Sequence, residues 1–299
     1  MQALNDTIIP VRESARENIA RLSAVSHKSP MNLETVVDWK NGIDFSKPPK
    51  EMDQLWIADT PYEAQLSDQQ KTELAWKETA RDVSMFIWLE QTLPPLYVGY
   101  VHKNMGKLSK EVEEYLMVFS REEIVHTLVF KRYMEMAGLD LFEPPELLYH
   151  LLSEVLPTLP PPLGIMVTLM LEWVAEAGAI HGTQGAEIDP LTRELFKQHH
   201  VEELRHIAFG RWVAESFMET ADEPQRQQAK AMLREVYNKI VANFSFNREI
   251  ARHVSFDFPA DVSDDAIVTA IQTSERNIAL NKERFGQMND WLTRLGIID

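Results

Sequence analysis

From Ser67 onward, apolar residues recur every three or four positions, the spacing of helices that bury one face. Gly138 is a typical C-terminal cap, and the pair Pro94-Pro95 is expected to kink or end a helix just beyond Glu90. The pattern predicts four long helices over 67–93, 109–137, 163–185 and 190–218, and other helices near 11–24, 144–156, 223–252 and 262–295. Alternating strands and helices are not evident, so the predicted fold class is all-α.

Residues 1–66 follow another pattern, because prolines interrupt the segment and its apolar residues are scattered. This segment is predicted to be an irregular N-terminal arm that packs on the body. Residues 67–299 are then expected to form a single helical domain.

Two of the long helices carry the same motif, Glu-Glu-x-x-His, at 122–126 and 202–206. A Glu and a His three residues apart project from the same face of a helix, which pairs Glu123 with His126 and Glu203 with His206. Each motif follows, at nearly equal distance, a Glu that ends an apolar run: Glu90 and Glu172. Buried carboxylates are costly unless they are paired or bind metal. The pattern therefore indicates a dinuclear metal site inside a four-helix bundle.

Several neighbouring residues leave alternatives open. His199 lies one turn before Glu203 on the same stripe, although His200 could be the inward residue instead. Glu176 competes with Glu172 and could instead support the ligands from outside. The phase of the helices turns Glu122 and Glu202 about 100° away from the ligand stripe, so both are expected to be solvated or to form structural ion pairs.

Composition narrows the chemistry. The chain has no cysteine, so thiolate metal sites are excluded, and a carboxylate and imidazole set favours iron or manganese. The net charge of −16 disfavours nucleic-acid partners. The apolar stretch 163–180 contains two glutamates and is expected to be a core helix rather than a membrane span. The first residues lack a signal-peptide core, so a cytoplasmic location is expected.

With its paired Glu-x-x-His helices, the chain resembles the ferritin-like non-haem diiron carboxylate proteins. The added histidine, in the pattern His-x-x-x-Glu-x-x-His at 199–206, resembles the AurF-type arylamine N-oxygenase family over roughly residues 30–295. The resemblance implies a ferritin-like four-helix bundle with extra C-terminal helices and two iron ions, with Glu123 and Glu203 as bridges. The implied ligands are Glu90, Glu123, His126, Glu172, His199, Glu203 and His206, with no further catalytic residue.

The resemblance also implies an enzyme that uses O2 to oxidise a small organic substrate, by N-oxygenation of an (aryl)amine. An external electron donor, an electron-transfer protein, is expected because the sequence has no flavin or nicotinamide motif. The protein is expected to form a homodimer. A desaturase or C–H hydroxylase is one alternative, because the segment 123–133 also resembles acyl-carrier-protein desaturases, which lack the third histidine. A metal-storage bundle is the other alternative. The long arm and the extra C-terminal helices favour an enzyme with a covered pocket.

Overall fold

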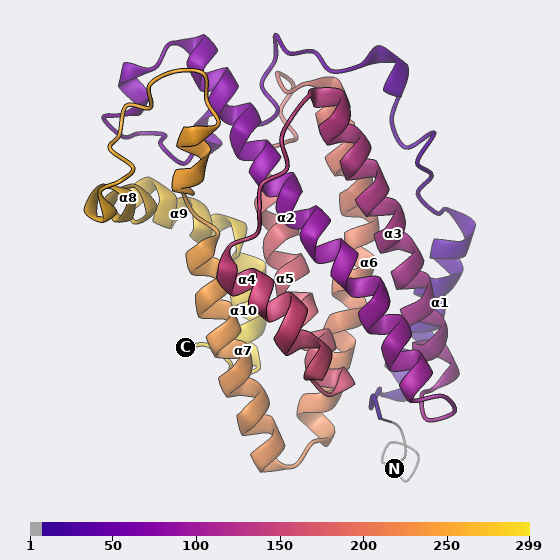
Figure 1. Ribbon diagram of the computed structural model, residues 1–299. Helices are drawn as coiled ribbons and strands as arrows, with labels where there is room; N and C mark the ends of the chain where they lie inside the picture. The colour runs from indigo at the N-terminus through magenta and orange to yellow at the C-terminus, as the bar shows by residue number, and fades with distance from the viewer. Residues whose placement is uncertain (1–7) are drawn as a thin grey trace.

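The computed structural model describes residues 8–299, with the backbone alone for 240–243, and the described residues form helices and loops without strands. Four long helices run side by side as the ferritin-like bundle (Figure 1). They are α2 (Asp68–Lys103), α3 (Lys110–Ala137), α5 (Pro161–His181) and α6 (Pro190–Thr220). The predicted all-α, ferritin-like fold class is confirmed.

The ends of these helices follow local signals in the sequence. The Ser67 hydroxyl and the Gln70 side chain form a capping box at the start of α2, and the Asp189 carboxylate accepts from Thr192 N at the start of α6. Gly138 ends α3 with φ 59°, a conformation that glycine adopts without strain. Local chemistry therefore fixes where these helices begin and end.

The predicted end of α2 near residue 93 is wrong. The helix continues through Pro94 and Pro95 to Lys103. Each proline removes one backbone hydrogen bond, but the residues beyond them are held by packing, since Leu93, Tyr97 and Tyr100 are buried in the core. Tertiary contacts therefore outweigh the local preference.

Helix α5 is apolar on every side because it lies at the centre of the protein. Among the described residues it is the one helix that is long and apolar enough to cross a membrane, yet 78% of its apolar window is buried inside the protein. The expectation of a core helix therefore agrees with its burial.

Shorter helices cover the bundle. Helix α1 (Glu13–Lys28) packs against α3 and α6, whereas α7 (Glu223–Asn243) packs against α5. Helix α4 (Glu146–His150) continues into a π-helical turn (Leu151–Val155) and a 3₁₀ turn (Leu156–Thr158).

The C-terminal region differs from the single helix predicted over 262–295. It forms three short helices, α8 (Asp265–Gln272), α9 (Glu275–Arg284) and α10 (Gly286–Arg294). Ser274 caps α9, and the buried Asn277 side chain donates to Trp56 O at 2.8 Å and Ile271 O at 2.7 Å. Ile278 of α9 is exposed.

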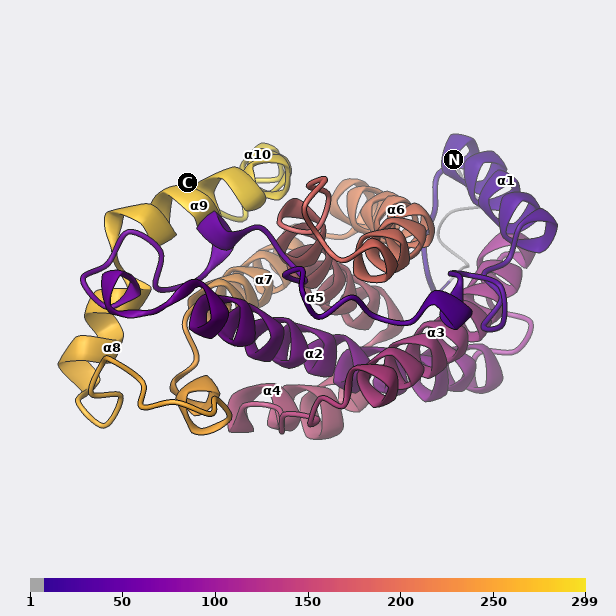
Figure 2. The ribbon, with the colours of Figure 1, turned by 90° about the horizontal axis from the view of Figure 1, so that it is seen from above.

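The segment between α1 and α2 crosses one end of the bundle (Figure 2). It contains 3₁₀ turns at Trp39–Asn41, Met52–Gln54 and Glu63–Gln65. Its backbone meets α6 where Met31 N donates to Glu202, the α5–α6 loop where Glu51 N donates to Gly182 O, and α9 where Asp53 O accepts from Arg276. This segment thus covers the end of the bundle that holds the ligand candidates of α6.

Candidate metal centre

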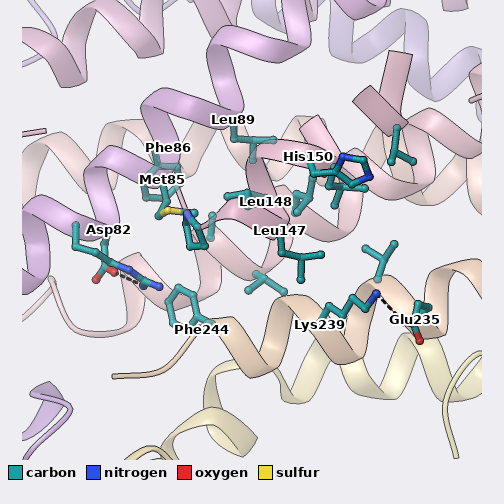
Figure 3. Close-up of a pocket in the computed structure, with 18 of the residues that line it drawn as sticks. Asp82, Met85, Phe86, Leu89, Leu147, Leu148, His150, Glu235, Lys239 and Phe244 are labelled. Atoms are coloured by element: carbon teal, nitrogen blue, oxygen red, sulfur yellow. Dashed lines mark hydrogen bonds and ion pairs between the residues drawn. The ribbon is translucent and has the colours of Figure 1, made fainter. Parts of the chain in front are cut away.

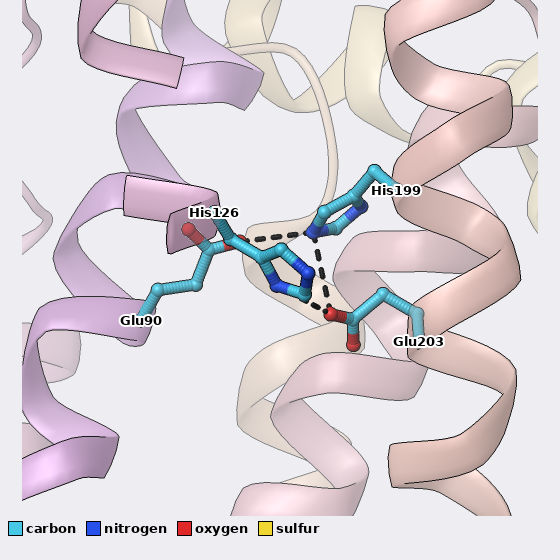
Figure 4. A group of neighbouring side chains, drawn as sticks. All are labelled: Glu90, His126, His199 and Glu203. Atoms are coloured by element: carbon cyan, nitrogen blue, oxygen red, sulfur yellow. Dashed lines mark hydrogen bonds and ion pairs between the residues drawn. The ribbon is translucent and has the colours of Figure 1, made fainter. Parts of the chain in front are cut away.

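The bundle core gathers the predicted ligands from α2, α3 and α6. Two overlapping groups of four donors form, each with its donor atoms within 4.8 Å of one another. One group is Glu90, His126, His199 and Glu203, drawn in Figure 4, and the other is Glu123, His126, Glu203 and His206. Since His126 and Glu203 belong to both groups, the two donor sets are adjacent.

Glu172 belongs to neither group, but it lies next to them on α5. Burial, and then the like charges of Glu203 and Glu123, raise the pKa of Glu172 well above its usual range. Its competitor Glu176 is also buried and accepts from His199 Nδ1 at 3.1 Å, on the side of the ring away from Glu90. Glu172 thus lies close enough to Glu203 and Glu123 for their charges to act on it, whereas Glu176 lies behind His199.

His199, and not His200, points into the centre. His199 Nε2 lies 3.0 Å from Glu90 and 3.3 Å from Glu203. His200 is partly exposed, and its Nδ1 lies 2.5 Å from Glu176. The arrangement leaves His199 with one ring nitrogen for the centre and one for Glu176.

The other two histidines are oriented across the helix pair. His126 of α3 presents Nδ1 to the site, and its Nε2 bonds Glu202 of α6 at 2.9 Å. His206 of α6 likewise presents Nδ1 to Glu123, and its Nε2 bonds Glu122 of α3 at 3.0 Å. A carboxylate that holds the far nitrogen of a metal-binding histidine fixes its tautomer and ring orientation.

Arg205 joins these two supporting glutamates. Its guanidinium donates to Glu122 at 3.0 Å and to Glu202 at 2.7 Å, and Met31 N also donates to Glu202. The expectation that Glu122 and Glu202 are solvated is wrong, because both are buried; the alternative of structural ion pairs is closer. The signal that could have identified them is the doubled Glu, which occurs at the same place in both motifs.

The seven candidates are deeply buried, none with more than 4% of its surface exposed. Burial and the like charge of Glu203 raise the pKa of Glu123 to about 7. Burial lowers the pKa of His199, but Glu203, Glu176 and Glu90 outweigh it and raise that pKa to about 10. Without cations, protons on the imidazoles balance the carboxylates, and such protons are released when metal binds.

The donor atoms fit metal ions better than they fit one another. Seven buried atoms of the site have no hydrogen-bond partner, although buried polar groups nearly always have one. They are Glu90 Oε2, both oxygens of Glu123, His126 Nδ1, Glu172 Oε1, Glu203 Oε1 and His206 Nδ1. Cations in contact with these oxygens and nitrogens would satisfy all of them.

Aromatic rings pack against the histidine donors. The Phe119 ring stacks on His206 with centroids 3.6 Å apart, and Phe119 holds the place in α3 that His199 holds in α6. The rings of Phe86 and Phe130 meet His199 edge-on at 5.0 and 4.8 Å. The two repeats thus differ by one imidazole, which lies on the side of α2.

Solved structures with the same fold are R2-like ligand-binding oxidases. The oxidase with an aerobically reconstituted Mn/Fe cofactor is 16% identical, with a TM-score of 0.56 over 92% of both chains. A valine-to-leucine variant of such an oxidase gives 16% identity, a TM-score of 0.57 and the same coverage. A search of curated proteins gives no match.

The comparison with protein-family models is more specific than the structural similarity, because it identifies a family. The model of the p-aminobenzoate N-oxygenase AurF matches residues 12–296, nearly the whole chain. The match agrees with the buried donors, the third histidine and the bundle described above. The chain is therefore an oxidoreductase that belongs to the AurF p-aminobenzoate N-oxygenase family.

Proposed function

We propose that this protein is a diiron oxygenase that uses O2 to N-oxygenate an amine, most simply an arylamine. The observation that supports it is the convergence of buried donors, with His199 added to the double Glu-x-x-His. The metal ligands in this proposal are Glu90, Glu123, His126, Glu172, His199, Glu203 and His206. Glu203 stands in both donor groups, which supports a bridging role, and Glu123 is the second proposed bridge.

Carboxylate and imidazole donors suit iron. The alternative is that manganese replaces one of the two iron ions. The similar oxidases named above carry Mn/Fe cofactors, which supports keeping both metals in view. When bound, the metals would supply the redox chemistry that activates dioxygen. The protein's own residues orient the histidines through Glu122, Glu202 and Glu176 and exclude water with the surrounding phenylalanines.

The first oxygenation step needs electrons from outside the chain. An amine R–NH2, O2, two electrons and two protons give R–NHOH and H2O, so one oxygen atom enters an N–H bond and the other leaves as water. The sequence contains no flavin or nicotinamide motif. An electron-transfer protein is therefore the proposed partner that supplies the two electrons.

The proposed assembly is a homodimer through the outer face of α2 and α3. Gln91 of α2 and Lys131 of α3 are hydrogen-bonded at 3.2 Å, which places the exposed sides of both helices on one face. That face carries the exposed apolar side chains Val98, Met105, Met117, Ile124 and Leu128. Light scattering should give a dimer, and Met117→Glu with Leu128→Glu should give a monomer. A monomer before substitution would refute the assembly.

The function is tested by loading and turnover. Protein loaded with Fe(II) without oxygen should bind close to two irons per chain, and with O2 and a chemical reductant it should convert arylamines to hydroxylamines or higher oxidation products, detected by mass spectrometry. The amines tested are p-aminobenzoate and para-butylaniline. Iron binding with hydroxylation of the butyl chain would favour a C–H hydroxylase, and iron oxidation without an organic product would favour storage.

His199→Ala separates these functions most sharply. The six remaining ligands should retain much of the iron, whereas N-oxidation should fall close to background. His200→Ala is the matched control, because that ring lies outside the donor groups, and it should retain both properties. Equal activity in His199→Ala and the unmodified protein would show that His199 is a packing residue and would remove the support for N-oxygenation.

A further inference from the structure

A cavity of about 370 Å³ is lined on one side by residues of α2 and α5 (Figure 3). Its other walls come from α4 with the π-helical turn and from α7. Its volume is within the range of small-molecule sites. Leu147 at its edge is 40% exposed, so the cavity reaches the surface there. One wall of the cavity contains the π-helical turn, and such turns are frequent at functional sites.

Phe86 separates this cavity from the metal centre. The residue lines the cavity, and its ring also meets the ring of His199 with centroids 5.0 Å apart. Leu89 and Leu171 line the cavity directly before the proposed ligands Glu90 and Glu172. A molecule in the cavity is therefore one side chain away from the proposed metals.

The cavity walls are almost entirely carbon. Leucine, valine, methionine and phenylalanine side chains form the interior, as Leu89, Leu148 and Met85 show in Figure 3. A buried carboxylate in such surroundings would need a cation to pair with it.

The charged groups of the lining are already paired with one another. Arg81 donates to Asp82 at 3.1 Å, and Lys239 pairs with Glu235 at 2.8 Å. Lys239 is half-exposed and stands at the rim, away from the carbon-lined interior. Each cation thus has an anion beside it, and the net charge of these four groups is zero. His150, the remaining titratable group of the lining, also has a carboxylate beside it, because its Nδ1 lies 2.9 Å from Glu154.

We propose that this cavity binds the substrate and that the substrate is a neutral, elongated, apolar amine, larger than a single carboxylated ring. The stretch of α2 from Asp82 to Leu89 that lines the cavity is about 10 Å long, at 1.5 Å per residue. An amine on a ring with an alkyl or second aryl group fills such a space, whereas the carboxylate of p-aminobenzoate finds no unpaired cation inside it. This inference rests on the proposed function for the choice of an amine.

Binding to the metal-free protein tests the cavity without depending on turnover. Calorimetric titration with para-ethyl-, para-butyl- and para-hexylaniline should show affinity rising about fourfold for each added methylene, the gain for burying one CH2. para-Pentylaniline should bind more tightly than para-aminophenylbutyrate, which has a side chain of similar length with a charged end. Tighter binding of the acid would overturn the proposal of a neutral substrate.

Two substitutions from opposite walls test the location. Leu148→Trp on α4 and Met232→Trp on α7 should each weaken para-hexylaniline binding at least about tenfold by filling the cavity. Tyr149→Trp, exposed on α4 and outside the lining, is the matched control and should leave binding unchanged. Circular dichroism identifies a variant that fails to fold. The variant on the opposite wall then provides the test.

The results separate two failures. Unchanged binding in both folded cavity variants would overturn the cavity as the binding site. Tight cavity binding without any N-oxidation by the iron-loaded protein would leave the site in place and refute the proposed function instead.

Discussion

The two halves of the bundle treat the metal centre differently. On the α3–α6 side, the far nitrogens of His126 and His206 are bonded to Glu202 and Glu122, and Arg205 links the two glutamates. On the α2–α5 side, Leu89 and Leu171, which directly precede the proposed ligands Glu90 and Glu172, line an apolar cavity instead.

The difference indicates a division of labour. Carboxylates that hold the far ring nitrogens of two histidines fix the orientation of those ligands, whereas ligands beside an open cavity have room to change their orientation. The rigid α3–α6 side is therefore expected to determine metal affinity, and the α2–α5 side to face the substrate.

The largest effect is expected from the two glutamates that stand three residues before the motif histidines, Glu123 and Glu203. Glu123→Ala and Glu203→Ala each remove a carboxylate from the centre of the donor groups, so iron should fall from about two to one or fewer per chain. Elemental analysis after anaerobic loading measures this. The apo-variants should remain helical, because packing of apolar faces supplies most helix stability. Full iron content in both variants would refute the ligand assignment.

The next effect concerns stability of the rigid half. Arg205→Met leaves Glu122 and Glu202 buried with their shared cation removed, and the free energy of unfolding should fall by about 3 to 5 kcal/mol. Urea denaturation of the metal-free protein measures it. Arg226→Met, which breaks an exposed pair with Glu223, should cost less than about 1 kcal/mol. Equal losses would mean that the buried network contributes no more than a surface pair.

These contacts also show where sequence reasoning stops. The spacing of Glu and His predicted the stripe of each helix, and the structure gathers those side chains in one core. A helical phase of about 100° was taken to turn Glu122 away from the site. In the bundle α3 lies beside α6, so the same direction points Glu122 at His206 of the neighbouring helix. Pairing between helices is not encoded in the periodicity of one helix.

The fold shows the same boundary between local and long-range information. Ser67, Asp189 and Gly138 act through their own neighbours, and their effects could be predicted. The division of 262–295 into three helices depends partly on Asn277, which bonds Trp56 more than two hundred residues away. The cavity likewise requires α4 and α7 to be placed against α2 and α5, so no sequence motif predicts it.

A smaller effect is expected from the glutamates behind the histidines. Glu122→Gln keeps the shape of the side chain but removes the charge that orients His206, so metal affinity should fall about 10- to 100-fold. Competition with a chelator measures it. Glu135→Gln, exposed on the same helix, is the control and should change nothing. A loss of metal as complete as in Glu123→Ala would mean that Glu122 itself is a ligand.

The smallest effect compares packing in the two halves. Leu116 of α3 is fully buried in the packed core, whereas Leu89 of α2 borders the cavity. Truncating a leucine costs its transfer free energy and an additional term for the space left behind, so Leu116→Ala should cost about 4 kcal/mol and Leu89→Ala about 2 kcal/mol. Urea denaturation of both metal-free variants gives the difference. Equal costs would show that the region around Leu89 is packed as tightly as the α3 side in solution. The contrast between a rigid half and an open half would then rest on the hydrogen bonds of the histidines alone.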